Sequence, residues 1–493
     1  MRRTAVIVMV SLVVGLIASL IRPATAPAAT PGVQHLHFEY GPLHLNPGQN
    51  IIQFSGTDVP KPTVPGWITG IAPNLILTDG TVPPVDHIHL HHAVWLNLSR
   101  TDATDPGLPQ RFFASGEEKT KLTLPPGYGY RFEPTDTWYL NYMLHVLDDK
   151  AYDVKLTYDL DFVPDAPGVN MREVVPWWLD VQNGSIYPVF DVPAGSGAGG
   201  TFTYPTQATN PYGGGPAKNE FTVPTDGELV QTAGHLHPGG LHTDLNLSRP
   251  ASGGRTKNAH LFKSAAHYFE PAGPVSWDVA MTATPSTWRV HVKPGDTLSV
   301  TATYNTTNWS WYEVMGIMVV WFAPGNGGDN PYKVKVDGKG AITHGHLPEN
   351  DNHGGSLDPT LADPATLPSG PRAKNVAIGS FQYVPGDLQG ATAIPTVKAG
   401  NTITFKNFDA PSSYGYGTWH TITTCKLPCN RSTGIAYPVA DAPLQLDSGQ
   451  LGNFDAPTKG TTSWTTPATL PPGDYSYFCR VHPFMRGAFR VVP

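Results

Sequence analysis

The feature that most constrains this chain is a loop near its end, Cys479-x-x-His482-x-x-Met485, which follows a strand-like run at 473–477. A thiolate, an imidazole and a thioether at this spacing can converge on one soft metal ion, and a further ligand should lie upstream. His420 lies in such a strand-like run. A His and Cys set with a weakly bound Met is typical of a blue-copper (type 1) centre. The alternative, a buried cysteine beside an unrelated histidine and methionine, is disfavoured for the four residues together.

Residues 376–493 resemble the cupredoxins, and within them the amicyanin and pseudoazurin branch, whose ligand loop has the spacing Cys-x-x-His-x-x-Met. Besides the loop, the resemblance rests on Val397-Lys398-Ala399-Gly400 at the start of a strand and on Leu446-Asp447-Ser448-Gly449 between the ligand regions. It implies a Greek-key β-sandwich whose copper exchanges single electrons and has no free position for substrate. The implied ligands are His420, Cys479 and His482 in the equatorial positions and Met485 in the axial one.

The beginning of the chain has the pattern of a secretory signal peptide. Two arginines precede an apolar run from 5 to 21, and small residues follow up to Ala29. We therefore expect residues 1–29 to be a signal peptide and the protein to be exported, whether secreted, periplasmic or at the cell surface. The apolar run is long enough for an uncleaved N-terminal anchor, which is the alternative and the only membrane attachment that we expect.

The rest of the sequence is typical of an all-β protein with many turns. Its 51 Gly and 50 Pro separate short runs rich in Val, Ile, Thr and Tyr, while 12 Trp, 20 Tyr and 19 Phe supply core material. A length of 493 residues fits about three domains. The net charge of −7 argues against a nucleic-acid partner, because phosphates require a positive face.

Two further cysteines, Cys425 and Cys429, lie just beyond His420. In an exported chain we favour a small disulfide that braces the ligand strand. A Cys-x-x-x-Cys metal site is the alternative. A thiol-redox role is weaker, because no βαβ pattern surrounds the pair.

The nineteen histidines are unevenly distributed, and the densest run contains His87, His89, His91 and His92. On a regular strand the first three would share one face, with His92 on the other. Four histidines so close together favour metal binding. Three later features follow in the sequence. His145 in a strand-like run and Met315 after Tyr304-Asn305-Thr306 are each weak alone, whereas alternation puts His235 and His237 on one face of a strand, where they can offer two imidazoles to one ion.

In this order, the segments within 35–325 resemble the copper type II, ascorbate-dependent monooxygenases, the family of dopamine β-monooxygenase and peptidylglycine α-hydroxylating monooxygenase. That family has a His-His pair, a single His, a His-x-His and then a Met after a Tyr-Asn-Thr strand. The resemblance implies two antiparallel β-sandwich lobes, 30–168 and 169–324, followed by a linker at 325–375 and the cupredoxin domain at 376–493. It implies two type 2 coppers: an electron-storing one on His91, His92 and His145, and an oxygen-binding one on His235, His237 and Met315.

The sequence departs from this family in two respects. Residues 30–375 contain no cysteine, whereas the family's secreted members brace their lobes with several disulfides. Extra histidines could also replace the carried-over ligands, since strand geometry pairs His89 with His91 and only the resemblance pairs His91 with His92. The other extra histidines near these motifs are His87 and His242. For His344, His346 and His353 in the linker we favour a solvated loop over another metal site.

We expect an exported, copper-dependent, monooxygenase-like oxidoreductase with a fused type 1 copper domain. An external electron donor or acceptor would dock on that domain. Dioxygen and a small-molecule substrate would bind to the lobes. The alternative is a non-enzymatic copper-binding or electron-carrier protein with structural lobes. A multicopper oxidase is disfavoured, because it places a histidine on each side of the copper cysteine, whereas Phe478 and Arg480 flank Cys479. Copper nitrite reductase is disfavoured on the same ground, because a histidine ligand of its second copper precedes its copper cysteine, whereas Phe478 stands in that position here.

Overall fold

The computed structural model describes residues 32–84, 87–180, 189–206, 219–268, 279–307, 311–334, 340–343, 356–357, 360–410, 418–425, 427–429, 431–432, 445–453 and 460–493. Over these residues the chain forms strands and two short 3₁₀ turns, Ser252–Gly254 and Pro364–Thr366, without an α-helix. The all-β prediction is therefore confirmed. The expected signal peptide and the linker histidines His344, His346 and His353 lie outside the described residues. Within the described part, no helix is long and apolar enough to cross a membrane.

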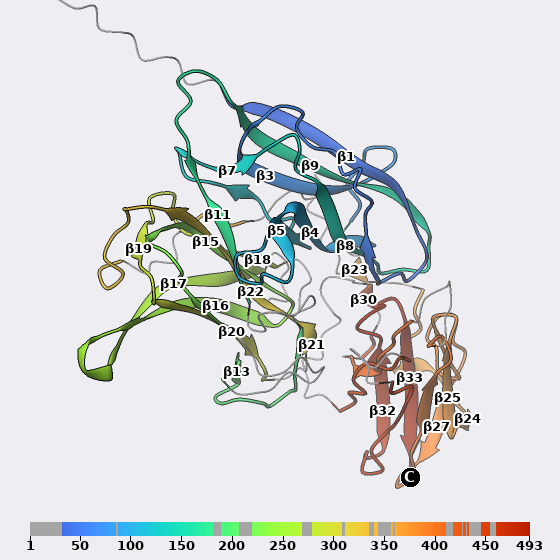
Figure 1. The fold of residues 1–493 in the computed structure, drawn as a ribbon. Coiled ribbons are helices and arrows are strands. Elements are labelled where there is room, and N and C mark those ends of the chain that lie inside the picture. Colours follow the sequence, from blue (N-terminus) through green and yellow to red (C-terminus); the bar gives the residue numbers. More distant parts are fainter. Residues whose placement is uncertain are drawn as a thin grey trace, which may run out of the picture.

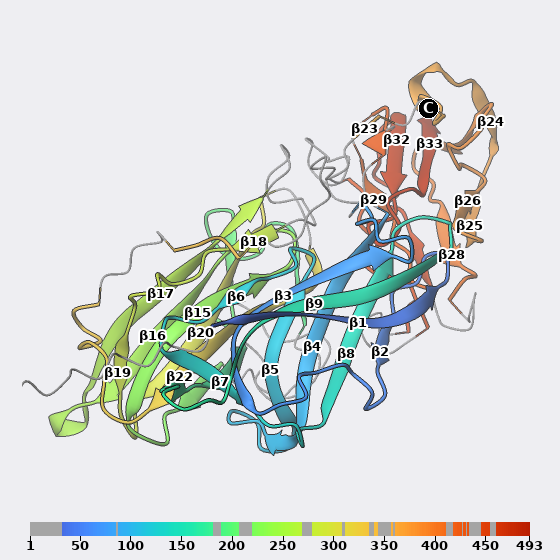
Figure 2. The same ribbon diagram turned by 90° about the horizontal axis from the view of Figure 1, so that it is seen from above.

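The first lobe consists of two sheets packed face to face, which cross over one another in Figure 2. One sheet has the order β1 (Gln34–Leu45), β9 (Tyr152–Pro164), β3 (Gly66–Leu77), β7 (Tyr128–Phe132) and β10 (Arg172–Glu173), with β6 (Leu122–Thr123) on β3. The other has the order β2 (Ile52–Phe54), β8 (Trp138–Val146), β4 (Ile88–Thr101) and β5 (Pro109–Gly116). Aromatic side chains, among them Trp95, Trp138 and Tyr158, fill the space between them.

The second lobe is also built from two main sheets. One has the order β11 (Val175–Asp180), β22 (Gly316–Pro324), β15 (Gly227–Leu236) and β19 (Val290–Val292). The other has the order β13 (Thr201–Tyr204), β20 (Thr297–Asn305), β16 (Gly240–Pro250), β17 (Thr256–Tyr268) and β18 (Val279–Met281), with β14 (Glu220–Thr222) on β20. A ribbon of β12 (Phe190–Val192) and β21 (Trp311–Val314) completes the lobe.

Strand β22 explains how the two lobes are held together. Its sequence, Gly-Ile-Met-Val-Val-Trp-Phe-Ala-Pro, is apolar without alternation, which is typical of a strand that is buried on both faces. Met318, Val320 and Phe322 point into the second lobe's core, whereas Trp321 and Ala323 join the core of the first lobe. The sheet that carries β15 and β22 therefore lies between the lobes and contributes side chains to the hydrophobic cores of both.

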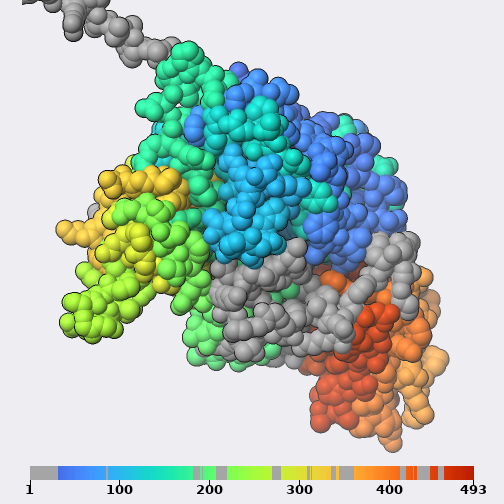
Figure 3. Space-filling view, viewed as in Figure 1, coloured from blue at the N-terminus to red at the C-terminus, as the bar shows by residue number. Residues whose placement is uncertain are grey.

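The C-terminal sandwich, defined by the strands after residue 360, forms a separate body (Figures 1 and 3). One sheet has the order β24 (Ser369–Arg372), β27 (Ile394–Lys398), β33 (Arg486–Val492), β32 (Gly473–Phe478) and β29 (Thr423–Thr424). The other has the order β26 (Gln382–Val384), β25 (Asn375–Gly379), β28 (Thr404–Asn407) and β31 (Ser463–Thr465). Two short strands, β23 (Ser356–Leu357) and β30 (Arg431–Ser432), pair with each other. The expected series of two sandwich lobes and a third sandwich is thus present, while the domain boundaries stay predictions.

Candidate metal centres

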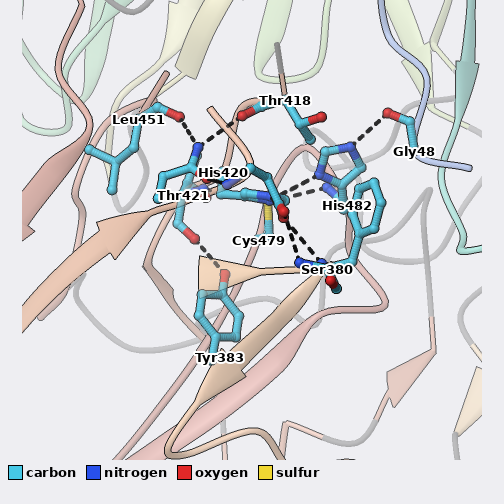
Figure 4. A network of polar contacts seen from close by, with 12 residues as sticks. Gly48, Ser380, Tyr383, Thr418, His420, Thr421, Leu451, Cys479 and His482 are labelled. Atoms are coloured by element: carbon cyan, nitrogen blue, oxygen red, sulfur yellow. Dashed lines mark hydrogen bonds and ion pairs between the residues drawn. The ribbon is translucent and has the colours of Figure 1, made fainter. Parts of the chain in front are cut away.

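The C-terminal sandwich brings three predicted ligands together in a buried group. Cys479 directly follows β32, His482 lies in the loop before β33, and His420 lies shortly before β29. The Sγ atom of Cys479 is 3.7 Å from Nδ1 of His420 and 3.8 Å from Nδ1 of His482, and the two Nδ1 atoms are 3.3 Å apart. Figure 4 shows the three side chains converging. One thiolate and two imidazole nitrogens therefore face a single point.

The far nitrogen of each imidazole is held by a specific acceptor. Nε2 of His420 donates to the carboxylate of Asp409 at 2.9 Å, and Nε2 of His482 donates to the carbonyl oxygen of Gly48 at 3.0 Å. These bonds orient the rings and leave both Nδ1 atoms for a metal ion, as outer hydrogen bonds do in metal sites. Gly48 belongs to the first lobe, so that lobe helps to build the centre.

The surroundings of Cys479 favour its thiolate. Burial opposes ionisation, but hydrogen bonds with His420 and His482 outweigh it and hold the pKa of the thiol well below its usual value. The backbone N–H groups of Thr421 and His482 also donate to Sγ, at 3.4 and 3.3 Å. A thiolate is the form of cysteine that binds metals.

The axial candidate Met485 lies in the same buried core cluster as Cys479. Its backbone closes the ligand loop, because its N–H donates to the carbonyl of His482 at 2.9 Å and its carbonyl accepts from the N–H of Cys479 at 3.2 Å. Cys425 and Cys429 are joined by a disulfide, as expected, and Cys479 is the free cysteine.

In the first lobe, a β-bulge in β4 redirects two histidines. The register with β8 shifts between Leu90 and His92, so that His91 is the extra residue of the bulge. Leu90 and Ala93 both point into the core, and His91 and His92 between them both lie on the outer side. Regular alternation would have put His92 on the opposite face from His91. The bulge removes that separation.

Six imidazoles then form a continuous cluster between the lobes, including His92, whose ring centroid is 5.8 Å from that of His91. His89 pairs with His145 across β4 and β8, with ring centroids 5.0 Å apart. The rings of His91 and His145 are 6.0 Å apart, and those of His91 and His237 are 5.0 Å apart. His235 completes the cluster at 5.2 Å from His237. Histidines that belong to different lobes and are far apart in the sequence are therefore neighbours in space.

Two acidic residues that sequence reasoning missed join this cluster. Glu117 and Glu118 follow β5 directly and are both buried. Glu117 forms a group with His91 and His237 in which one ligand atom from each residue lies within 4.8 Å of the others. Nδ1 of His235 is 3.8 Å from the carboxylate of Glu118. Adjacent acidic residues next to a strand usually indicate a solvated turn, so the sequence carried no signal for their burial.

A mostly apolar cavity of about 290 Å³ lies between the lobes beside this cluster. Its walls come from β4, β5 and β8 of the first lobe and from β11, β15 and β22 of the second. They include three predicted ligands, His92, His235 and Met315. Burial, followed by the charge of His235, lowers the pKa of His92 to about 3, so this imidazole is neutral and able to act as a ligand at neutral pH.

The distances between the histidine rings do not follow the two ligand sets that the sequence resemblance implies. His91 is 5.8 Å from His92 and 6.0 Å from His145 by ring centroids, but it lies nearer to His237 of the other set. Tyr304 connects the second set, because its hydroxyl accepts from the N–H of His237 at 3.2 Å and donates to the carbonyl of Met315. Both ligand sets stay predictions.

The extra histidines named in the sequence have different surroundings. His89 belongs to the cluster between the lobes. His87 contacts the carboxylate of Asp148 at 3.0 Å, and His242 contacts that of Asp244 at 2.7 Å.

The C-terminal group and the interlobe cluster are directly adjacent. The ring centroids of His145 and His482 are 6.2 Å apart. Burial lowers the pKa of His145 well below its ordinary value, as do His89 and His482, while a hydrogen bond with the backbone of Val481 opposes the shift. Phe381 packs against His482 at 5.0 Å and against His420 at 5.7 Å. The imidazoles of His482 and His145 thus join the two groups without an intervening residue layer.

Comparison with known proteins gives partial matches. The chain is 27% identical over 263 residues to a probable copper-dependent oxygenase, M1, from a Phoma species, a match that covers 51% of this chain and 60% of that protein. It is 26% identical over 246 residues to the probable copper-dependent oxygenase clz3 of Cochliobolus lunatus, covering 48% of this chain and 70% of that protein. The chain thus spans less than two thirds of the Phoma relative. No family model matches the sequence.

Among solved structures, amicyanin from Paracoccus versutus is 20% identical, with 27% of this chain and 91% of that chain covered and a TM-score of 0.15. A purple cupredoxin from Nitrosopumilus maritimus is 19% identical, with 24% and 98% covered and the same TM-score.

Proposed function

We propose that this protein is a copper-dependent oxidoreductase of the oxygenase type, with an electron-transfer centre in its C-terminal sandwich. The observation that carries the proposal is the adjacency of His482 and His145, whose ring centroids are 6.2 Å apart. With copper held by both groups, an electron that enters at the C-terminal centre would have a short path through His482 and His145 to a copper between the lobes. Export through the N-terminal leader and an external electron donor are parts of the same proposal.

The donor set of the C-terminal centre fits a type 1 copper. His420, Cys479 and His482 offer two imidazole nitrogens and a thiolate, with Met485 as the axial thioether, which is the ligand set of blue-copper sites. When bound, copper supplies one-electron redox chemistry. The protein orients the ligands through Asp409 and Gly48 and moderates the thiolate through the N–H groups of Thr421 and His482.

The cavity favours an enzyme over an electron carrier. A ligand pocket is expected to be a mostly apolar concavity with a few polar groups, and this cavity has such walls with His92, His235 and Met315 among them. A carrier that only exchanges electrons has no use for such a space. We therefore propose that a small, largely apolar molecule binds there, next to the residues that would hold the oxygen-binding copper. The two partly matching relatives, both named probable copper-dependent oxygenases, support this choice.

Oxygen consumption by the copper-loaded protein tests the proposal. With a reductant and a panel of apolar C–H substrates, we expect the wild type to take up oxygen. Met315→Leu should abolish substrate-dependent uptake, because it preserves volume but removes the thioether. Met318→Leu is the matched control, since Met318 is buried in the second lobe's core and does not line the cavity. Absence of uptake by the wild type with every substrate would leave a non-enzymatic copper-binding electron carrier as the function.

The C-terminal centre is tested by its colour. We expect an intense visible band in the oxidised protein, from thiolate-to-copper charge transfer, and its complete loss in Cys479→Ser. Metal analysis should find more than one copper per chain, and the non-blue copper should remain in Cys479→Ser. A colourless wild type loaded with copper would exclude the type 1 centre.

A further inference from the structure

One carboxylate and two imidazoles come together between the two lobes. His91 comes from β4, Glu117 follows β5, and His237 follows β15. Their exposed fractions are 5%, 1% and 2%. Nδ1 of His91 is 3.9 Å from Oε1 of Glu117, and one ligand atom from each of the three residues lies within 4.8 Å of the others.

Specific backbone features place each of these side chains. The bulge in β4 turns His91 away from the core of the first lobe. A turn after β5, in which the N–H of Lys119 donates to the carbonyl of Gly116 at 2.9 Å, carries Glu117. The N–H of His237 donates to the hydroxyl of Tyr304 at 3.2 Å. The three residues are thus fixed by three different local structures.

Gly116 permits the close approach of the two lobes at this point. A Cβ atom there would lie 2.7 Å from Cε1 of His235 and 2.9 Å from the carboxylate of Glu118, both far too close. A side chain at this position would push His235 and the carboxylate of Glu118 away, so Gly116 lets His235 of the second lobe lie against the first lobe.

We propose that His91, Glu117 and His237 together bind one metal ion that bridges the two lobes. The proposal changes the sequence-based grouping in one respect: His91 and His237, which that grouping assigns to separate sites, share one ion with Glu117. His235 and Met315 stay the candidate ligands beside the cavity. Two imidazoles and a carboxylate form a ligand set that leaves at least one position open for an exogenous ligand. His89 and His145 lie beside this site and connect it to His482.

The geometry requires only a small closure of the side chains. Ligand bonds of about 2.0–2.2 Å in a tetrahedral arrangement place ligand atoms roughly 3.4 Å apart. The atoms of this group are within 4.8 Å of one another, so movements of about an ångström suffice.

A metal ion in this position has a structural consequence as well as a chemical one. It is bound only when the lobes are docked, so its binding free energy adds to the stability of the interface. The inference rests on the proposed function in taking the physiological ion to be copper. The ligand geometry is independent of that function, and a redox-inert ion is therefore a suitable probe.

The test uses the full chain with Cys479→Ser, which removes the C-terminal centre's thiolate. Zn²⁺ is titrated into this protein, and bound metal and the midpoint of thermal unfolding are measured. We expect Zn²⁺ to raise the midpoint, and Glu117→Gln to lose one equivalent of bound metal together with most of that rise. The matched control is Glu228→Gln, which alters an equally buried carboxylate that is paired with Arg172 and distant from the cluster.

Unchanged stoichiometry and an unchanged midpoint shift in Glu117→Gln would overturn the proposal. If Glu117→Gln does not fold, Glu117→Asp replaces it, because aspartate keeps the negative charge on a shorter side chain. We expect this variant to bind one equivalent of Zn²⁺ at least tenfold more weakly than the parent protein. Unchanged affinity in Glu117→Asp would overturn it too. Oxygen uptake is measured separately in the otherwise wild-type background, so a metal-binding site in a protein without uptake would overturn the proposed function alone.

Discussion

The carbonyl oxygen of Gly48 accepts a hydrogen bond from Nε2 of His482 at 3.0 Å, although the two residues are 434 positions apart in the sequence. Gly48 lies just after β1 in the first lobe, and His482 is a candidate ligand in the C-terminal sandwich. The bond fixes the proton of His482 on Nε2 and leaves Nδ1 to face Cys479. The ligand geometry of one body therefore depends on the docking of another.

Substitution of Gly48 should disturb the C-terminal centre from outside its own sandwich. Gly48 has a φ of +61°, and a Cβ atom there would overlap the ring of Phe381 and approach Nε2 of His482 to 3.2 Å. We expect Gly48→Ala to shift the visible band of the copper-loaded protein and to slow electron transfer to the interlobe cluster. Visible spectroscopy and stopped-flow reduction measure both effects.

Gly80→Ala is the matched control for that experiment. Gly80 also has a positive φ, +90°, but a Cβ atom there meets nothing within 4 Å. Both variants carry the left-handed strain of about 1–2 kcal/mol, so a spectral change confined to Gly48→Ala isolates the contact with Phe381 and His482. Identical spectra in the two variants would contradict a role for the docked first lobe.

Asp409 should control metal affinity through His420. Its carboxylate accepts from Nε2 of His420 at 2.9 Å and from the backbone N–H groups of Ser380 and Phe381. Loss of such an outer carboxylate typically weakens metal binding by about 10–100-fold. We expect Asp409→Asn to weaken copper binding by that factor, as measured by competition with a chelator. Asp387→Asn is the control, because the carboxylate of Asp387 accepts from the backbone N–H groups of Tyr383 and Gln389, and no candidate ligand is among its hydrogen-bond partners in the described part of the chain.

The sequence was sufficient for the strand content and for the grouping of His420, Cys479 and His482, because these depend on local patterns: short apolar runs between turns, and a ligand loop with a characteristic spacing. The order of the three sandwiches was implied by the two family resemblances. The interlobe cluster could not be derived in the same way. It depends on a one-residue bulge at His91 and on burial of Glu117, and neither leaves a periodic trace in the sequence.

Filling the cavity should reduce the binding of apolar molecules without affecting the C-terminal centre. Val94 lines the cavity from β4, and Val94→Phe adds an aromatic ring to a space of about 290 Å³. We expect weaker binding of a solvatochromic apolar dye to Val94→Phe, with an unchanged visible copper band. Val384→Phe is the control, because Val384 is exposed on the C-terminal sandwich. Equal dye binding by both variants would place the apolar site elsewhere.

The metal-free protein should lose stability on mild acidification because of its buried imidazoles. Burial and neighbouring imidazoles lower the pKa of His145 well below 6.5, and burial lowers that of His92 to about 3. Below pH 6.5 the unfolded chain therefore takes up protons that the folded protein does not, and the free energy of unfolding falls as pH falls. Each such imidazole contributes about 1.4 kcal/mol per pH unit.

The contribution of a single imidazole can be isolated by comparing the wild type with His145→Gln. The midpoint of denaturant-induced unfolding of the metal-free proteins is measured at pH 7.5 and at pH 5.0. Because glutamine does not titrate, the variant should lose less stability over this interval, by about 2 kcal/mol, whatever its stability at pH 7.5. His35→Gln is the control, because His35 is exposed and pairs with Asp161 at the surface of the first lobe, outside the interlobe cluster. Equal pH dependence in the wild type and His145→Gln would mean that His145 is already protonated in the folded, metal-free state.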